Sequence, residues 1–424
     1  MLDIKLLREK PDFVKRRILT RGCGPHTLVD KVLAYDENRR KAETDKQGLQ
    51  SERKTLSKQI GALIGQGKAE EAEAIKEQVR VLGDKISVLD EQSHESEEHQ
   101  MALLQTIPNL PHPDCPLGAD EEANPVVREW GEKREVTEPK DHVELAEALG
   151  LISFEDAVRI AGSGFAVYRG QGAKLQRALI QYLLDLQTET NGYEEVNVPH
   201  LINRECMLGT GQLPKFEDDM YGLNEGRTFL APTAEVPVTN LYRDTLLNED
   251  QLPIKMTAHT PCFRREAGSA GRDNKGIIRM HQFDKIELVQ VVNPNKSMEV
   301  LEELTGHAES ALQNLGLHYR VIELCSGDVG FSACKTYDIE VWAPGQGKYL
   351  EVSSCSSFGD FQARRMKLRY KDGDGKNQFC HTLNGSGTAL PRLMVALLEQ
   401  YQNPDGTISI PEPLQKYFGQ ELIS

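Results

Sequence analysis

Residues 260–290, TPCFRREAGSAGRDNKGIIRMHQFDKIELVQ, predict two antiparallel strands joined by a glycine-bearing loop. Side chains alternate between the faces of a strand, so Arg264 and Glu266 are expected on one face of the first strand. By the same rule Phe283 and Glu287 share one face of the second strand. A guanidinium can bind two phosphate oxygens, a phenyl ring can stack on a purine, and a carboxylate accepts from an amine or a hydroxyl. The stretch therefore favours a nucleotide site, although an ordinary charged hairpin would alternate in the same way.

The loop between the two strands, residues 267–279, combines glycine with positive charge. Glycine permits bends that other residues resist, and cations suit polyphosphate or nucleic acid. The residues concerned are Gly268, Gly271 and Gly276 with Arg272, Lys275 and Arg279. A phosphate-binding loop is expected, and a merely solvated loop is the alternative.

The wording of this stretch resembles the second signature motif of class II aminoacyl-tRNA synthetases. The matching residues are Phe263-Arg264-Arg265-Glu266 and Arg279-Met280-His281-Gln282-Phe283. The longer run CFRREAGSAGRDNKGIIRMHQFDKIE is similar to the version in bacterial-type seryl-tRNA synthetases, and a match of this length is specific. The resemblance implies activation of serine with ATP and transfer to the 3′ end of tRNA(Ser), and of tRNA(Sec) as well.

Composition sets bounds on the kind of protein. A chain of 424 residues suits two to three domains, and a formal net charge of -15 argues against nonspecific coating of nucleic acid. Any RNA contact should then come from local basic patches. The eight cysteines have no C-x-x-C spacing, which indicates reduced thiols, and no apolar run approaches the roughly 20 residues that span a bilayer. We therefore expect a cytoplasmic protein without membrane contact.

Two apolar ladders near the N-terminus predict an antiparallel coiled-coil hairpin with its tip at residues 61–68. The first ladder is Leu28, Tyr35, Ala42, Leu49, Leu56 and Leu63. The second ladder is Ile75, Val79, Leu82, Ile86, Leu89, Ser93, Ser96, Gln100 and Leu103. An oligomerisation coiled coil would show the same pattern. An arm that reaches RNA is supported by the cations of the first limb, and the resemblance implies that it grips tRNA; these are Arg39, Arg40, Lys41, Lys46, Arg53, Lys54 and Lys58.

Repeated prolines after the hairpin, between residues 108 and 125, mark a linker at about residues 107–140. We expect a tRNA-binding domain over residues 1–109 and a catalytic domain over residues 110–424. Short helices are predicted in residues 141–161, an amphipathic helix in residues 172–189, and strands at residues 193–199, 318–325, 337–343 and 348–354. The later strands follow one another without crossover helices, which predicts a mostly antiparallel sheet. The fold class is α+β, with the helical hairpin followed by a class II catalytic domain whose sheet is flanked by helices.

The helix at 172–189 and the strand at 193–199 resemble the first class II motif, which implies a homodimer. Residues 382–387 lead into a predicted helix at residues 390–401, with Arg392 at an exposed position in its first turn. A cation there opposes the helix dipole, so a phosphate partner would explain it. This segment resembles the third class II motif, with Pro391 where the family often has glycine; proline suits a first helical turn.

Glu351 and Ser354 are expected near one strand end and offer oxygen ligands that suit Mg²⁺ on a nucleotide, although a polar strand terminus would look the same. The resemblance implies three catalytic residues, Arg264, Glu266 and Arg392. It implies that ATP is bound by Arg264, Arg265, Glu266, Arg279, Phe283, Glu351, Val352, Ser353, Ser354 and Arg392, with Mg²⁺ on Glu351 and Ser354. It implies that serine is bound by Thr233, Ala234, Glu235, Arg264, Glu287, Asn384 and Ser386.

Common parallel-sheet nucleotide folds lose support, because neither G-x-x-x-x-G-K-[ST] nor G-x-G-x-x-G occurs. Three alternatives stay open. A carrier-protein aminoacyl ligase would share the catalytic domain but lack the long arm. A noncatalytic tRNA-binding paralogue would keep the arm and lose catalytic residues. Another class II synthetase is the mildest alternative.

Overall fold

The computed structural model describes residues 1–22, 24, 26–267 and 275–424. The chain forms two compact units. One comprises Leu2–Leu19 and Gly24–Ile107, and the other comprises Met1, Thr20–Cys23 and Pro108–Ser424.

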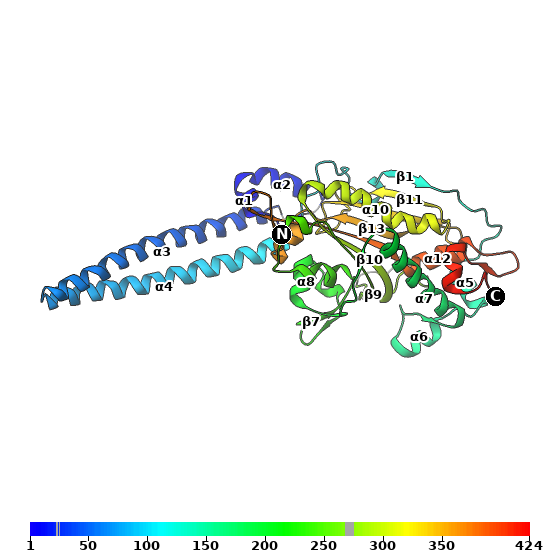
Figure 1. Cartoon of the computed structure of the whole chain (residues 1–424), viewed down its shortest axis with the longest axis horizontal. Helices are drawn as coiled ribbons and strands as arrows, with labels where there is room; N and C mark the ends of the chain where they lie inside the picture. Colours follow the sequence, from blue (N-terminus) through cyan, green and yellow to red (C-terminus); the bar gives the residue numbers. More distant parts are fainter. Residues whose placement is uncertain (23, 25, 268–274) are drawn as a thin grey trace. The chain divides into compact units, whose positions relative to one another are not determined.

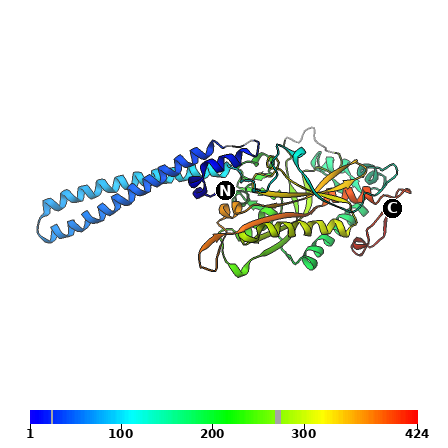
Figure 2. The same cartoon turned by 90° about the horizontal axis from the view of Figure 1, so that it is seen from above.

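The smaller unit is a pair of long antiparallel helices, α3 (Leu28–Gly65) and α4 (Ala69–Thr106), which lie side by side in both views (Figures 1 and 2). The short helices α1 (Ile4–Glu9) and α2 (Pro11–Leu19) pack against α3. Every member of the two predicted ladders is buried or half-buried, so the coiled-coil prediction is confirmed. The turn is shorter than predicted, because α3 continues through Gly61 to Gly65 and only residues 66–68 separate the helices.

A buried carboxylate ties the elements of this unit together. Asp36 on α3 is fully buried and accepts from Arg8 on α1 at 2.7 and 3.0 Å, and from Gln100 on α4 at 3.0 Å. Arg40 adds a contact of 2.9 Å from the next turn of α3. A buried charge is stable only with such partners. Because Asp36 and Gln100 must lie opposite each other for this contact, the cluster fixes the register of the two long helices.

The larger unit is built on an eight-stranded sheet in which every neighbouring pair is antiparallel except β4 and β9. This confirms the predicted sheet type. In spatial order the strands are β1 (Val126–Trp130), β11 (Tyr319–Glu323), β12 (Lys335–Ala343), β13 (Lys348–Ser357), β16 (His381–Ala389), β10 (Gln282–Val292), β9 (Ile254–Phe263) and β4 (Glu194–Glu195).

Alternation along β10 separates the core from the site. Ile286, Leu288 and Val292 point into the main apolar core, where they pack with side chains of three helices. These helices are α7 (Gly170–Asp185), α10 (Ser297–Asn314) and α12 (Leu390–Gln400). Because successive side chains of a strand face opposite ways, Phe283, Lys285 and Glu287 face the other side. One face of the sheet is thus packed with these helices, and the other carries the polar side chains of β10 beside smaller apolar clusters that contain Val289 and Val291.

Smaller elements complete this unit. The remaining helices are α5 (His142–Ala148), α6 (Phe154–Ala161), α8 (Arg204–Thr210), α9 (Glu235–Thr239), α11 (Phe361–Met366) and α13 (Glu412–Phe418). The remaining strands are β2 (Ile152–Ser153), β3 (Val167–Tyr168), β5 (Leu201–Asn203), β6 (Gly222–Leu223), β7 (Thr228–Leu230), β8 (Leu246–Asn248), β14 (Arg369–Lys371), β15 (Asn377–Phe379), β17 (Ile408–Ser409) and β18 (Leu422–Ile423).

Three local predictions are wrong. Strand β9 ends at Phe263, so Arg264 and Glu266 do not alternate on a strand, and Glu266 has a left-handed backbone with φ of 51°. The strand predicted at residues 193–199 is reduced to β4, Glu194–Glu195. Glu351 and Ser354 lie within β13 rather than near a strand end.

All seven cysteines in the described part of the chain are free thiols, and Cys23 lies outside it. None of the helices among the described residues combines the length and apolar character needed to cross a bilayer.

Candidate active site

A cavity of about 780 Å³ opens on the polar face of the large sheet. The predicted site residues that line it are Thr233, Glu235, Arg264, Glu266, Arg279, Phe283, Glu351, Val352, Ser354, Asn384, Ser386 and Arg392. They come from β10, β13, β16, α9 and α12 and from the segments after β7 and β9. The fold therefore gathers residues that are up to 159 positions apart, from Thr233 to Arg392, around one space.

Cations and an aromatic ring gather at one end of the cavity. The Arg264 guanidinium lies 5.2 Å from the centre of the Phe283 ring, and its Nε donates to the Pro232 carbonyl at 3.3 Å. Glu266 accepts from Arg279 at 2.5 Å. A guanidinium group can donate two hydrogen bonds to phosphate oxygens, and an aromatic ring beside it can stack on a purine.

Arg392 has more protein partners than its first-turn position predicts. Its Nη1 donates to the Glu351 carbonyl at 2.8 Å and its Nε to the Ile278 carbonyl at 3.2 Å. The Glu351 carboxylate lies 3.5 Å from Nη1. The side chain is one-quarter exposed rather than free in solvent, so the expectation of an exposed cation is wrong. These contacts hold the guanidinium in the cavity wall.

Carboxylates gather at the other end, around a buried ion pair. Glu287 is 1% exposed, pairs with Lys285, and accepts from the Thr233 hydroxyl at 2.7 Å and from Asn384 at 3.3 Å. Lys285 also donates to the Thr233 hydroxyl at 2.9 Å. Glu287 thus lies beneath the cavity surface, under side chains that do line it.

Glu235 supplies a second buried carboxyl group here. It accepts from Gln362 at 2.7 Å, and burial, followed by the negative charge of Glu287, raises the pKa of Glu235 to about 7. Two carboxyl groups therefore share this end with Lys285. A ligand that brings a positive charge of its own, such as an ammonium group, would be well accommodated.

Comparisons with known proteins match both units. Residues 1–111 match the seryl-tRNA synthetase N-terminal domain, and residues 215–401 match the tRNA synthetase class II core domain (G, H, P, S and T). A serine–tRNA ligase of Akkermansia muciniphila is 66% identical over 423 residues, which cover 100% of this chain and 99% of the relative. The chain belongs to the seryl-tRNA synthetase family.

Solved structures agree with this assignment. The seryl-tRNA synthetase of Pyrococcus horikoshii, complexed with ATP, is 36% identical with a TM-score of 0.94 and coverage of 100% of this chain and 99% of that one. The cytoplasmic serine–tRNA ligase of Naegleria fowleri, in complex with AMP, is 30% identical with a TM-score of 0.88 and the same coverage. This chain is an ATP-dependent serine–tRNA ligase of class II, and its predicted α+β fold is confirmed.

Sequence reasoning missed two buried charged residues, Lys285 in the wall of the synthetase site and Asp338 beside it. Lys285 stands between Phe283 and Glu287 on the same face of β10, so the period of the strand could have revealed it. Asp338 on β12 lies opposite Ser354 in register, and burial, followed by the charge of Glu351, raises its pKa well above the usual range. Nothing in the local sequence distinguishes Asp338 from an ordinary strand residue.

The residues near Asp338 fit a magnesium ion that is shared with phosphates. One buried oxygen of Asp338 has no hydrogen-bond partner, and an extra residue in β13 between Glu351 and Ser353 lets Glu351 line the cavity together with Ser354. No group of three or more metal-ligating side chains occurs among the described residues. Mg²⁺ commonly takes one or two carboxylates and completes its shell with water and phosphate, which this sparse set permits.

Several predicted site residues of the synthetase are not in the cavity wall. Ser353 points away and donates to the Ser386 carbonyl at 2.5 Å, and Ala234 is buried in a small apolar cluster. Arg265 is held through its backbone, whose N–H donates to Asp219 at 2.9 Å, and its side chain does not line the cavity. Gly268, Gly271 and Arg272 lie outside the described residues.

Proposed function

We propose that the two ends of this cavity divide the activation of serine between them, with ATP at the arginine end and serine at the carboxylate end. The observation that supports this division is that Arg264 belongs to both ends: its ring contact is with Phe283, while its Nε donates to Pro232, the neighbour of Thr233. Serine-dependent ATP–pyrophosphate exchange, run across the twenty amino acids, tests the proposal. Serine alone should support rapid exchange.

At the ATP end we assign four contacts. Phe283 stacks on the adenine, Glu266 accepts from its amino group, Arg264 binds the α-phosphate, and Arg392 binds the γ-phosphate. Arg279 acts by pairing with Glu266, which orients that carboxylate. When bound, Mg²⁺ on Glu351 and Ser354 would neutralise phosphate charge.

At the serine end the ammonium group binds the Glu235 carboxylate, with the charge of Glu287 beneath the cavity surface in support, and the substrate hydroxyl uses the remaining polar groups of Thr233, Asn384 and Ser386. Arg264 holds the serine carboxylate beside the α-phosphate. Attack on that phosphorus displaces pyrophosphate in line and needs positioning and charge neutralisation rather than a protein nucleophile or general base. The sequence also assigned four other residues to the substrates. For these we propose contacts through backbone atoms only: Ala234, Arg265, Val352 and Ser353.

We assign tRNA(Ser), and by extension tRNA(Sec), to the helical arm. Arg53, Lys54 and Lys58 lie close together on α3, and the ion pairs recorded for the described residues include none of them. Arg39, Arg40 and Lys46 are instead paired with carboxylates of the arm. Unpaired cations release counterions when they meet phosphate, which favours the first group as the RNA contact.

We also assign a homodimer and a cytoplasmic location. Light scattering measures the first, and cell fractionation measures the second.

Deleting residues 29–103 should spare serine activation and greatly weaken tRNA charging, because no residue that lines the cavity lies in this range. Rates of pyrophosphate exchange and of aminoacylation, measured on the same preparation, separate the two steps. A finer version replaces Arg53, Lys54 and Lys58 by alanine, with Glu95, Glu97 and Glu98 as a matched control on α4. If the truncated protein charges tRNA at the normal rate, the arm does not bind tRNA and serves only in oligomerisation.

The raised pKa of Glu235 predicts pH-dependent serine binding. If the carboxylate form binds the ammonium group, KM for serine should fall about tenfold from pH 6 to pH 8, because the pKa of this group is about 7. Glu235→Gln should bind serine poorly at both pH values and remove this dependence. A wild-type KM that does not change with pH would contradict the assignment.

The same raised pKa of Glu235 makes the ligand-free protein less stable as pH rises, whereas serine binding improves. The folded pKa of about 7 exceeds the ordinary value of 4.5, so this group's stabilising contribution is complete below pH 4.5 and is lost as pH rises through 7. Glu235→Gln should therefore raise the free energy of unfolding of the ligand-free protein more at pH 8 than at pH 5, by on the order of 3 kcal/mol. Urea unfolding at the two pH values measures this difference.

A further inference from the structure

Helix α12 carries a charge of unfavourable sign at each end. Arg392 is its third residue and Glu399 is next to last, whereas the helix dipole favours anions at the start and cations at the end. The two residues are seven positions apart, about two turns, so they share one face of the helix. Both reach the same short segment of chain: Arg392 through the Ile278 carbonyl, and Glu399 through His142, which contacts the Ile277 N–H.

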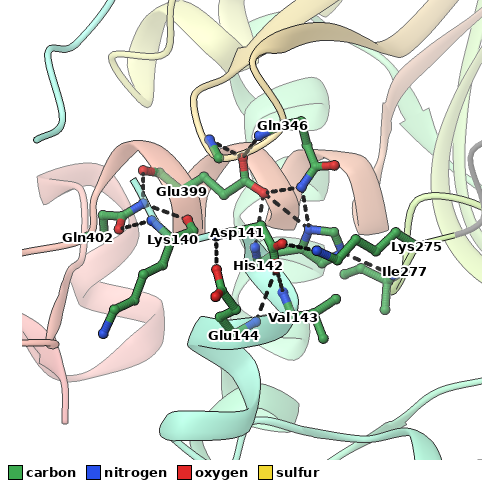
Figure 3. A network of polar contacts seen from close by, with 11 residues as sticks. Lys140, Asp141, His142, Val143, Glu144, Lys275, Ile277, Gln346, Glu399 and Gln402 are labelled. Carbon is green, nitrogen blue, oxygen red and sulfur yellow. Dashed lines mark hydrogen bonds and ion pairs between the residues drawn. The ribbon is translucent and has the colours of Figure 1, made fainter. Parts of the chain in front are cut away.

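Glu399 is completely buried and gathers donors from two separate elements (Figure 3). The turn between β12 and β13 donates the backbone N–H of Gly345 at 2.9 Å, the N–H of Gln346 at 3.2 Å and the Gln346 side chain at 2.9 Å. The start of α5 donates the backbone N–H of His142 at 3.0 Å, and the His142 Nδ1 lies 3.1 Å from the carboxylate. The carboxylate thus anchors His142 to α12 and to the turn.

The neighbours of His142 fix which ring nitrogen carries the proton. The backbone N–H of Ile277 lies 3.3 Å from Nε2 and can only donate, so Nε2 must present its lone pair. The proton of the neutral ring therefore sits on Nδ1 and points to Glu399. Gln346, 3.4 Å from Nδ1, then directs its amide hydrogens to Glu399 instead. The two hydrogen bonds therefore run in one direction: the Ile277 N–H donates to the imidazole, and the imidazole donates to the Glu399 carboxylate.

The segment before Ile277 is fitted to the same residues of α5. Gly276 has a φ of 61°, and a Cβ there would lie 2.1 Å from His142 Nε2 and 2.6 Å from Val143. Lys275 donates to Asp141, which also accepts from the backbone N–H groups of Val143 at 2.9 Å and Glu144 at 3.1 Å (Figure 3). Three successive residues, 275–277, are therefore held against α5 by three different contacts.

We propose that His142 is a positioning residue for ATP. By holding the Ile277 amide, it fixes Ile278, whose carbonyl accepts from Arg392, and Arg279, which pairs with Glu266; all three residues 277–279 line the cavity. This inference rests on the proposed ATP end of the cavity. The direct contacts stay with Arg392 and Glu266, and His142 acts through the backbone between them.

Two substitutions of His142 separate its two hydrogen bonds. Glutamine reaches the position of Nε2 and can offer an oxygen to the Ile277 N–H, whereas asparagine ends near Nδ1 and can only replace the donor to Glu399. In pyrophosphate exchange, His142→Asn should raise KM for ATP about tenfold or more, since small misplacements of contact groups are costly. KM for serine should change less than about twofold, and His142→Gln should recover most of the ATP affinity.

Gln346→Ala is the matched control, because it removes a donor to Glu399 without touching Ile277. It should leave KM for ATP unchanged. Hydrogen exchange at the Ile277 amide supplies a readout independent of activity: faster exchange is expected in His142→Asn and near-normal exchange in His142→Gln. Gly276→Ala tests the same fit with His142 in place and should also raise KM for ATP.

Equal KM values for ATP in the asparagine and glutamine variants, or unchanged exchange at Ile277 in His142→Asn, would overturn the inference. Arg392→Ala, measured in parallel, distinguishes this failure from that of the proposed function. If Arg392→Ala leaves ATP use intact, the ATP end itself is misassigned. If Arg392→Ala impairs ATP use and His142→Asn does not, only the positioning role fails.

Discussion

Glu287→Gln should lower kcat/KM for serine in ATP–pyrophosphate exchange by about 30-fold or more, which corresponds to roughly 2 kcal/mol of transition-state binding. The substitution keeps the size of the side chain and one of its two oxygens, which can still accept from Thr233, and it removes the charge that pairs with Lys285. Its amide nitrogen replaces the oxygen that accepts from Asn384, so that hydrogen bond is lost. Alanine at this position would remove both oxygens and leave Lys285 buried without any acceptor on this residue, so glutamine is the cleaner probe. Glu303→Gln, at a partly exposed site outside the cavity, is the control.

Discrimination against alanine should weaken in the same variant. A site that hydrogen-bonds a substrate hydroxyl rejects an analogue that lacks it, because buried polar groups are then left unpaired. Threonine keeps the hydroxyl and adds a methyl group, so its exclusion depends on the shape of the pocket. Relative kcat/KM values for serine and alanine measure the effect, and an unchanged serine preference would remove Glu287 from serine recognition.

Arg392→Ala should reduce adenylate formation by about 100-fold or more, the size of loss expected when a donor to charge that develops on the departing pyrophosphate is removed. The loss should appear in ATP-dependent exchange with little change in KM for serine, because Arg392 lies at the arginine end of the cavity. Its hydrogen bonds to Ile278 and Glu351 are also lost, so thermal unfolding of the variant must be compared with wild type. Arg392→Gln, which can still donate to the Glu351 carbonyl, separates the charge from these contacts. Near-normal exchange in the alanine variant would contradict the γ-phosphate assignment.

The features that the sequence predicts well depend on regular spacing or on motif wording. The arm follows from its apolar ladder, because each turn of a coiled coil buries positions that recur every three or four residues. The antiparallel sheet follows from strands such as β12 and β13 that are joined by a short turn. Motif residues such as Arg264 and Phe283 meet in space because β9 and β10 pair in the register that the hairpin implies.

Features that depend on interruptions of this regularity could not be predicted. Strand β9 ends one residue before Arg264, and the extra residue in β13 changes which side of the strand Glu351 faces. Both effects arise from backbone irregularities that simple alternation ignores. The buried ion pair between Lys285 and Glu287 was not predicted, because charged residues on a strand face are ordinarily assigned to solvent.

Contacts between distant residues form the other unpredicted class. His142 meets Ile277 and Glu399, which lie 135 and 257 positions away in the chain. No local pattern marks such a relay, since a histidine at the start of a short helix is unremarkable by itself. The charges at both ends of α12 oppose the helix dipole, which is a sequence signal for buried or ligand-bound partners. The sequence analysis used this signal for Arg392 but not for Glu399.

We propose that one cavity holds the nucleotide at its arginine end and serine at its carboxylate end, and a crystal structure with a non-hydrolysable seryl-adenylate analogue is the decisive measurement. We expect adenine on Phe283, the phosphate-replacing group beside Arg264, and the ammonium group at about 3 Å from Glu235 or Glu287. An analogue bound in the reverse direction, or an ammonium group remote from both carboxylates, would contradict it.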